Sequence, residues 1–448
     1  MTTSPIPLPD RGSDTPTGSL PIVTGPVTSS PPSGARFPWV GLIALSAAVF
    51  LSVTSEMIPT GLLPDMSASL GVTESQVGFL VSAFAFTVVL TSAPLTALTV
   101  RIPRKTLIMS VLVLLAVANV LTALAPTYPL VLLTRVLGGI GHGLFWSMVG
   151  AYAAHLVPKE LIGRAVSITL AGGTLAFVLG VPLGTAAGHA VGWRLSFVGI
   201  AVLLLVGAVV VYKFLPPVER ELDAHADDSA ADARASGSPA ASGRAGARRP
   251  VDPTVFSVAL VCITVAIVMI GHYSFYTYIA PYLTDVIGVP EAQISLALFG
   301  FGITGALGLV LAGTVFAKRT TRGLLICIGL SIVFVTALAL VAGWFWAALI
   351  IFLVWGIAYG AIAPLMQTRM LHSASARIRD TASAFYTTAF NVGIGGGAFA
   401  GGLLLDGIGI ESLPYFYVVL LVIGGVLVVV ARRYELAVRR RSGVAPTR

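Results

Sequence analysis

Apolar stretches of about 20 residues recur along the whole chain, and we count twelve of them. A helix rises about 1.5 Å per residue, so each stretch is long enough to cross the hydrocarbon core of a bilayer. The stretches do not alternate strictly between apolar and polar residues, which favours helices over the strands of a membrane barrel. The predicted spans are 38–63, 76–98, 106–125, 129–156, 163–188, 193–214, 254–283, 292–316, 323–342, 344–371, 381–405 and 412–431.

Composition supports the same fold class. Of the 448 residues, 56% are hydrophobic and only 10% are charged. Soluble domains carry about 25% charged residues, so an ordinary soluble enzyme is excluded. We therefore predict an all-α membrane protein with twelve transmembrane helices.

Basic residues gather in alternate connections between the predicted spans, whereas the connections between them carry mainly acidic residues. This is the positive-inside pattern, and it places both termini in the cytoplasm of a multi-pass protein of the cell membrane. The net charge of +8 then reflects topology and contact with anionic lipids, not binding of nucleic acid. The basic positions are Arg101, Arg104, Lys105, Lys159, Arg164, Lys318, Arg319, Arg322, Arg377, Arg379, Arg432, Arg433 and 439–441.

The chain repeats itself at a fixed offset of 217 residues. Because this offset moves six spans, an even number, the two halves have parallel topology and should be related by an axis along the membrane normal. Such halves suit alternating access, in which two bundles rock about a central site. The matched positions include 70–77 with 287–294, Pro64 with Pro281, Gly139 with Gly356, Gly143 with Gly360, Gly180 with Gly397 and Gly184 with Gly401.

The polar segments outside the spans set the predicted domain boundaries. A segment rich in Ala, Ser, Asp and Arg separates the two halves and predicts a flexible linker. We expect a single chain to be the working unit. The predicted parts are a disordered cytoplasmic tail at 1–37, a six-helix bundle at 38–215, the linker at 216–253, a second six-helix bundle at 254–432 and a basic tail at 433–448.

Glu56 lies inside the first predicted span, and no other acidic residue lies as deep in any of the twelve stretches. A carboxylate at membrane depth is costly. It therefore indicates a proton relay, an ion site or a counter-ion for substrate. We predict that Glu56 takes part in proton coupling.

Arg135, in the fourth span, is the only strongly basic residue that the sequence places deep in a span. It lies six residues from Pro129, and Glu56 lies eight residues from Pro64, both counted from the outer end. The two depths are about 9 and 12 Å, so the opposite charges should pair or share a water-filled cavity. We predict a proton-coupling role for Arg135 too; a purely structural ion pair is the alternative.

Further polar and aromatic residues are predicted to line a central cavity. His142 and Trp146 share one helix face with Arg135 to within about 20°. His142 either titrates near neutral pH or is bonded to a neighbouring helix. At the repeat offset, Glu56 falls on Tyr273 of the seventh span. Aromatic residues with polar tips suit a neutral or amphipathic ligand. The second-half candidates are His272, Tyr273, Tyr276, Trp355 and Tyr359.

Glycine motifs indicate close helix packing, and the fifth span has a special one. Gly180, Pro182 and Gly184 form G-V-P-L-G, which predicts a bend. The sequence has no nucleotide-binding loop, no metal-ligand spacing and no nucleophile motif, so we expect neither an enzyme nor a cofactor or metal.

Four motifs resemble the major facilitator superfamily, in particular its twelve-span drug:proton antiporters of the sugar and arabinose efflux branch. They are T-S-E-M-I-P-T-G-L-L-P at 54–64, R-V-L-G-G-I-G-H-G at 135–143, L-G-V-P-L-G-T at 179–185 followed by G-W-R, and N-V-G-I-G at 391–395. The last motif adds Asn391 to the cavity-lining candidates. The loop at 96–105 keeps the family's bases but lacks its aspartate.

The resemblance implies proton-coupled export of a small organic molecule: a drug, an antibiotic or a sugar-like compound. Three alternatives stay open. The chain is a facilitator or proton-coupled importer of a sugar or nucleoside, a non-transporting membrane sensor or scaffold, or, least favoured, a membrane enzyme. A sensor needs a signalling domain, and neither the linker nor the tails has the apolar content to fold one.

Overall fold

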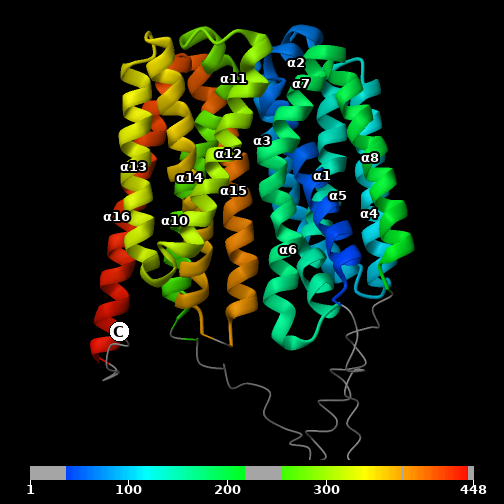
Figure 1. Ribbon diagram of the computed structural model, residues 1–448, viewed down its shortest axis with the longest axis vertical. Coiled ribbons are helices and arrows are strands. Elements are labelled where there is room, and N and C mark those ends of the chain that lie inside the picture. The colour runs from blue at the N-terminus through cyan, green and yellow to red at the C-terminus, as the bar shows by residue number, and fades with distance from the viewer. Residues whose placement is uncertain (1–36, 217–251, 253, 376, 442–448) are drawn as a thin grey trace, which may run out of the picture. The chain divides into compact units, whose positions relative to one another are not determined.

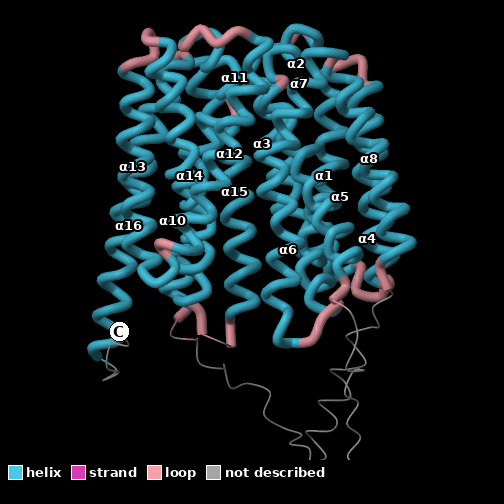
Figure 2. Tube along the Cα trace, viewed as in Figure 1, coloured by secondary structure: helices cyan, strands magenta, loops and turns pink. Residues whose placement is uncertain are grey.

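The computed structural model describes residues 37–216, 252, 254–375 and 377–441, and within these ranges it consists of helices and their connections (Figures 1 and 2). Twelve of the described helical segments are long and apolar enough to cross a membrane. The prediction of an all-α membrane protein with twelve transmembrane helices is confirmed. The predicted N-terminal tail and nearly all of the linker lie outside the described residues.

The first half of the molecule contains six spans, one of which is interrupted. The fifth span contains a π-helical turn directly before Pro182, where G-V-P-L-G predicted a bend. Proline has no amide hydrogen to donate, which favours such an irregular turn. The elements are α1 (Trp39–Gly61), α2 (Leu63–Leu70), α3 (Glu74–Leu98), α4 (Arg104–Leu124), α5 (Tyr128–His155), η1 (Lys159–Leu161), α6 (Ile162–Leu175), η2 (Ala176–Gly180), α7 (Val181–Val191) and α8 (Trp193–Phe214).

The second half also contains six spans. The last helix continues to Arg441, into the segment expected as a basic tail. The elements are α10 (Val255–Tyr276), α11 (Ile279–Pro281), η3 (Tyr282–Val286), α12 (Glu291–Thr314), η4 (Ala317–Arg319), α13 (Thr320–Leu340), α14 (Phe345–Ser373), α15 (Arg379–Gly407), η5 (Ile410–Ser412) and α16 (Leu413–Arg441).

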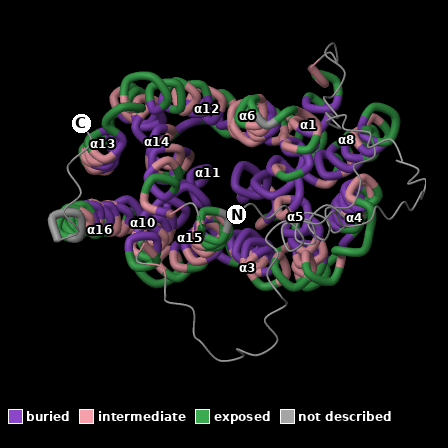
Figure 3. Tube along the Cα trace, turned by 90° about the horizontal axis from the view of Figure 1, so that it is seen from below, coloured by how far each residue is buried: buried purple, intermediate pink, exposed green. Residues whose placement is uncertain are grey.

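Within the unit that begins at Pro38, each half packs mainly on itself. In the first half α1 contacts α6 and α8, and α4 contacts α5 and α8. In the second half α10 contacts α15 and α16, and α12 contacts α14. The halves meet where α3 packs along α15 and where α7 packs on α12. Viewed along the helices, buried residues lie inside and exposed residues outside (Figure 3). Large apolar side chains such as Leu90 and Leu340 are exposed, as lipid contact requires.

We call the end of the bundle at which α1 begins and α16 finishes the lower end, and the end that carries α2 and α11 the upper end (Figure 1). Near the upper end, Ser75 of α3 donates a hydrogen bond to Asp406 of α15 at 2.5 Å. Tyr278, between α10 and α11, packs against both Gly78 of α3 and Gly402 of α15, where any larger side chain would overlap its ring. These contacts close the seam between the halves there.

Candidate functional site

The middle of α1 carries the polar centre of the first half. Every residue from Leu51 to Gly61 is buried, although the stretch includes Ser52, Ser55 and Glu56. Glu56 is only 4% exposed, so its carboxylate faces the protein interior and not the lipid. A buried charge needs a partner inside the protein.

The partner of the Glu56 carboxylate is His142 of α5. The Oε2 atom of Glu56 lies 3.3 Å from Nε2 of His142, and both side chains are almost fully buried. The other ring nitrogen, Nδ1, lies 2.8 Å from Oγ of Ser52, one turn before Glu56 on α1. The imidazole therefore bridges two side chains of the same helix. The bond to a neighbouring helix, one of the two alternatives for His142, is present in its contacts with Ser52 and Glu56 of α1. Titration of His142 near neutral pH stays a prediction.

Arg135 binds the backbone of α1 instead of the carboxylate. Its guanidinium donates to the carbonyl oxygens of Ser55 at 2.9 Å and Glu56 at 2.8 Å. It also lies over the ring of Phe84, 4.4 Å from the ring centre. The sequence correctly placed the two charges at neighbouring depths. Of the two expected arrangements, the described residues show no direct contact between the carboxylate and the guanidinium, because the carboxylate contacts His142 instead. A shared water-filled cavity stays a prediction.

Trp146 lies one turn beyond His142 on α5. Its half-buried ring packs beside the imidazole, with ring centres 6.0 Å apart. The Nε1 atom of Trp146 has no hydrogen-bond partner in the described structure. Phe84 packs edge-on against the other side of the imidazole at 5.2 Å. The face predicted from the spacing along α5 thus contains His142 and Trp146 in contact.

The glycine motif of the fifth span lets the helix approach α1 closely. A Cβ atom added at Gly180 would overlap Thr54, and one added at Gly184 would lie 2.7 Å from Ile58. These positions flank Glu56 along α1. From the other side, Ser55 and Asn119 of α4 bond to each other through Oγ and the side-chain amide at 2.8 and 3.0 Å. Packing and hydrogen bonds therefore fix the section of α1 that carries the acid.

The second half places a cluster of aromatic rings around His272 of α10. The imidazole stacks on Tyr359 of α14, with ring centres 3.4 Å apart, and on Tyr276 at 5.1 Å. Trp355 and Tyr417 lie within 6 Å of the same ring. The Nδ1 atom of His272 is buried without a hydrogen-bond partner in the described structure. The candidates Tyr273, Tyr276, Trp355 and Tyr359 thus form one cluster around His272. Tyr417 also belongs to this cluster, and the sequence did not predict it.

Tyr273 and Tyr359 connect this cluster to the acid. The two phenols interact electrostatically, and the charge of Glu56 also acts on Tyr273. Asn391 of α15 is less central, because its amide donates to the carbonyl oxygen of Thr387 in its own helix at 2.9 Å. Within the described structure, the half-buried Asn391 makes no hydrogen bond to the other candidates.

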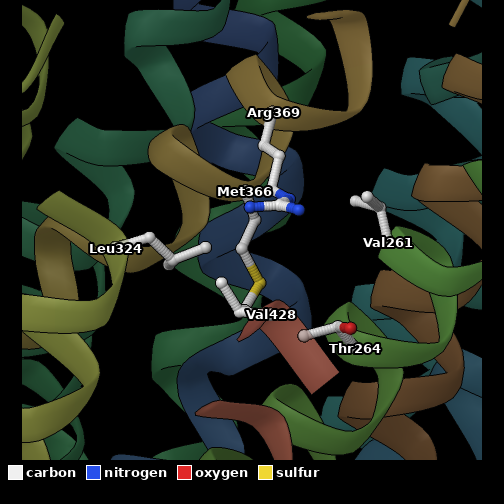
Figure 4. Close-up of a pocket in the computed structure, with 6 residues that line it drawn as sticks. All are labelled: Val261, Thr264, Leu324, Met366, Arg369 and Val428. Atoms are coloured by element: carbon white, nitrogen blue, oxygen red, sulfur yellow. The ribbon is translucent and has the colours of Figure 1, made fainter. Parts of the chain in front are cut away.

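Sequence reasoning overlooked Arg369, a second buried cation, near the lower end of α14. It is 4% exposed and lies 3.5 Å from Glu435 of α16 and 3.0 Å from Thr321. Arg369 was missed because it lies close to the end of its predicted span. It borders a cavity of about 10 Å³, room for one water molecule and not for a substrate (Figure 4). The other lining residues are Val261, Thr264, Leu324, Met366 and Val428.

The described residues contain no group of three or more His, Cys, Asp or Glu side chains placed to hold a metal ion. The chemistry that the arrangement does offer is proton exchange at Glu56 and His142, next to a surface of aromatic rings and hydroxyl groups.

Comparison with known proteins identifies the family. The sequence profile of the Major Facilitator Superfamily matches residues 45–282 and 261–447. A probable sugar efflux transporter of Mannheimia succiniciproducens is 28% identical over 385 residues, which cover 86% of this chain and 92% of that protein. A probable sugar efflux transporter of Helicobacter pylori strain J99 is also 28% identical, with 85% and 92% covered.

Solved structures share the fold at lower identity. A bacterial homologue of the human lysosomal transporter Spinster, in an inward-facing and unoccupied conformation, aligns with a TM-score of 0.71 and 19% identity over 90% of this chain and 98% of its own. A D-xylose–proton symporter aligns with a TM-score of 0.69 and 17% identity over 88% and 97%. The profile match, supported by this shared fold, establishes that the chain is a membrane transporter that belongs to the Major Facilitator Superfamily.

Proposed function

We propose that this transporter exports a small sugar-like molecule and takes up protons in exchange. The observation that carries the proposal is the Glu56 carboxylate, buried at the middle of a transmembrane helix and in contact with His142. A buried acid with an imidazole partner can gain and lose a proton as the site opens to either side. The curated relatives at 28% identity, named as probable sugar efflux transporters, support the substrate class.

The second half contributes a buried aromatic cluster that would meet such a substrate when the two halves move apart. Tyr273, Tyr276, Trp355 and Tyr359 surround His272 with ring faces and polar tips. Ring faces pack against the C–H groups of a sugar, and hydroxyl and imidazole groups exchange hydrogen bonds with its hydroxyls. Drugs and antibiotics of similar size are the other ligands that this surface suits, and resistance to them is an expected phenotype.

One proton per cycle is enough for useful export. A proton that enters down 100 mV and one pH unit releases about 2.3 plus 1.4 kcal/mol. This sum supports a gradient of roughly 500-fold for a neutral substrate. In the proposed setting the protein lies in the cell membrane with both termini in the cytoplasm, as the distribution of Lys and Arg predicts. The lower end is then the cytoplasmic end.

The test is substrate-dependent proton movement in proteoliposomes that contain the purified chain. Labelled L-arabinose serves as the first probe, followed by other sugars, nucleosides and antibiotics. We expect an imposed proton gradient to drive the probe against its concentration gradient, in the direction opposite to the protons. Uphill transport in the same direction as the protons, or no effect of the proton gradient on transport, would contradict antiport.

A proton-coupled importer or a facilitator is the second candidate. A D-xylose–proton symporter has the same fold at 17% identity, so the fold is compatible with import as well as export. The same vesicles separate the candidates. An importer moves protons and probe together, and a facilitator moves the probe with no change in internal pH.

A further inference from the structure

We propose that His142 is a proton relay on the lower side of Glu56, and that it works by exchanging its two neutral tautomers. This inference rests on the proposed proton coupling and extends it to a second residue. The geometric basis is the chain of contacts from the Glu56 carboxylate to Nε2 of His142 at 3.3 Å and from Nδ1 to the Ser52 hydroxyl at 2.8 Å.

The contacts of the imidazole allow two complementary arrangements. When Glu56 is ionised, Nε2–H donates to the carboxylate, and Nδ1 accepts from the Ser52 hydroxyl. When Glu56 is protonated, its O–H donates to Nε2, and Nδ1–H donates to the oxygen of Ser52. Each of the two contacts therefore joins one donor to one acceptor in both arrangements. The imidazole stays neutral in both.

Conversion between the arrangements moves one proton along the chain of groups. In release, the Glu56 proton passes to Nε2, the Nδ1 proton passes to the Ser52 oxygen, and the hydroxyl proton of Ser52 passes to water. The Glu56 carboxylate is left charged, and one proton has left the site. Uptake by the same path is the reverse. A histidine donates and accepts in this way because its two nitrogens exchange roles.

The surroundings of His142 favour a neutral ring. Among the described residues, the charged groups that act on it are Glu56 of α1 and Arg135 of its own helix. From α3 it meets the apolar ring of Phe84, and Trp146 packs beside it on α5. The cation of Arg135 repels a second positive charge, whereas exchange of tautomers changes no net charge on the ring.

The position of the relay gives it a direction. Ser52 lies one turn closer to the lower end than Glu56, a step of about 6 Å along α1. In the proposed orientation that is the cytoplasmic side. Ser52 is fully buried here, so water reaches its hydroxyl only when the lower side of the bundle opens. Release of the proton is thereby linked to the inward-open step of the cycle.

Nitrogen-15 NMR of the full-length protein in lipid, with labelled histidine, tests the tautomers without any substrate. We expect the His142 signals to change from the Nε2–H to the Nδ1–H tautomer as the pH falls and Glu56 takes up its proton. In Glu56→Gln the change with pH should disappear. His142→Gln identifies the signals among the six histidines of the chain. A single tautomer at all pH values, or an imidazolium at low pH, would overturn the relay.

Proteoliposomes with labelled L-arabinose test the consequence for transport. In His142→Gln, proton-driven uphill transport should fall about 100-fold, the scale of a lost proton-transfer group, while exchange of labelled for unlabelled probe is retained. Ser52→Ala should likewise lose uphill transport and keep exchange. His155→Gln is the matched control, because His155 lies on the same helix but is exposed. If wild type moves no protons with any probe, the proposed function fails. If wild type couples transport to protons and both His142→Gln and Ser52→Ala transport the probe uphill as well as wild type, only the relay is wrong.

Discussion

The two halves of the transporter place the same contacts at equivalent positions but fill them with different chemistry. Glu56 and His142 touch in the first half. Their counterparts at the offset of 217, Tyr273 and Tyr359, interact electrostatically in the second half. The two equivalent positions therefore interact in both halves. They hold an acid and an imidazole in the first half and two phenols in the second.

A second pair of contacts follows the same rule. In the first half the Arg135 guanidinium lies over Phe84; in the second, the equivalent residues Phe352 and Phe301 stack at 4.9 Å. Among these equivalent positions, the charged groups belong to the first half alone. The comparison teaches that the same framework holds a buried acid and imidazole in one half and a cluster of aromatic rings in the other.

The largest expected effect follows from replacing the acid. Glu56→Gln keeps the shape of the side chain but cannot ionise, so uphill export should fall from a gradient of up to about 500-fold to none. The measurement is probe accumulation in proteoliposomes under a proton gradient.

The equivalent change in the other half provides the control. Tyr273→Phe removes one hydroxyl that can bond a sugar hydroxyl, a bond worth about 1 kcal/mol, so affinity should weaken about fivefold while coupling remains. If Tyr273→Phe loses proton coupling, or if Glu56→Gln keeps it, the proposed difference in role between the two halves is wrong.

Arg135 gives the next largest effect, on stability. Arg135→Ala leaves the Ser55 and Glu56 carbonyls without their donor and creates a cavity, so the free energy of unfolding should fall by about 3 kcal/mol. Arg135→Phe introduces the residue of the equivalent position 352 and should lose less, because the new ring can stack on Phe84. Denaturant unfolding in detergent compares the two. Equal losses would show that the framework is not shared.

Glycine positions sharpen the comparison at a smaller scale. A Cβ at Gly360 of α14 would overlap the backbone of Gly305, whereas at the equivalent Gly143 the nearest atom lies 3.3 Å away. Gly360→Ala should therefore cost about 1–3 kcal/mol of stability, and Gly143→Ala clearly less. Gly150→Ala, with open space around the new methyl group, is the control. Thermal unfolding ranks the three, and a different order would count against the packing described here.

The smallest effect concerns Asp252, before α10. The side chain of Thr254, then the hydroxyl of Ser375, donate to its carboxylate and hold the pKa of Asp252 below its ordinary 3.8. Position 158, the counterpart of Ser375, is a proline and has no such donor.

Because the pKa of Asp252 is lowered in the folded state, the hydrogen bonds to its ionised carboxylate stabilise the fold above the ordinary pKa, near pH 4. This contribution to stability is lost as the pH falls through the lowered pKa. Protection of the α14–α15 connection against hydrogen exchange, relative to the intrinsic exchange rate at each pH, should accordingly fall below about pH 4 in wild type. In Asp252→Asn this relative protection should be similar at all pH values. A pH response that is unchanged in Asp252→Asn would exclude this carboxylate as its source.

Much of the architecture could be predicted because it depends on local properties of the chain. Span length, apolar content and the repeat offset each report a property of contiguous residues, and they predicted twelve helices and the depth of Glu56 and Arg135. The G-V-P-L-G motif predicted an irregular fifth span in the same way, since a proline inside a helix disturbs its backbone wherever it packs.

The sequence by itself determined that this protein is a bundle of membrane helices with one deep acid, because the cost of exposing backbone or charge to lipid depends only on composition and spacing. The tertiary structure alone decided which group meets that acid. Helical periodicity fixes the depth of His142 and Arg135 and the helix face on which they lie. The rotation of α5 against α1 and the side-chain rotamers decide that the Glu56 carboxylate contacts the imidazole and that the guanidinium binds the backbone. Arg369 illustrates the same limit, since its burial depends on α16, a helix distant in sequence that supplies Glu435.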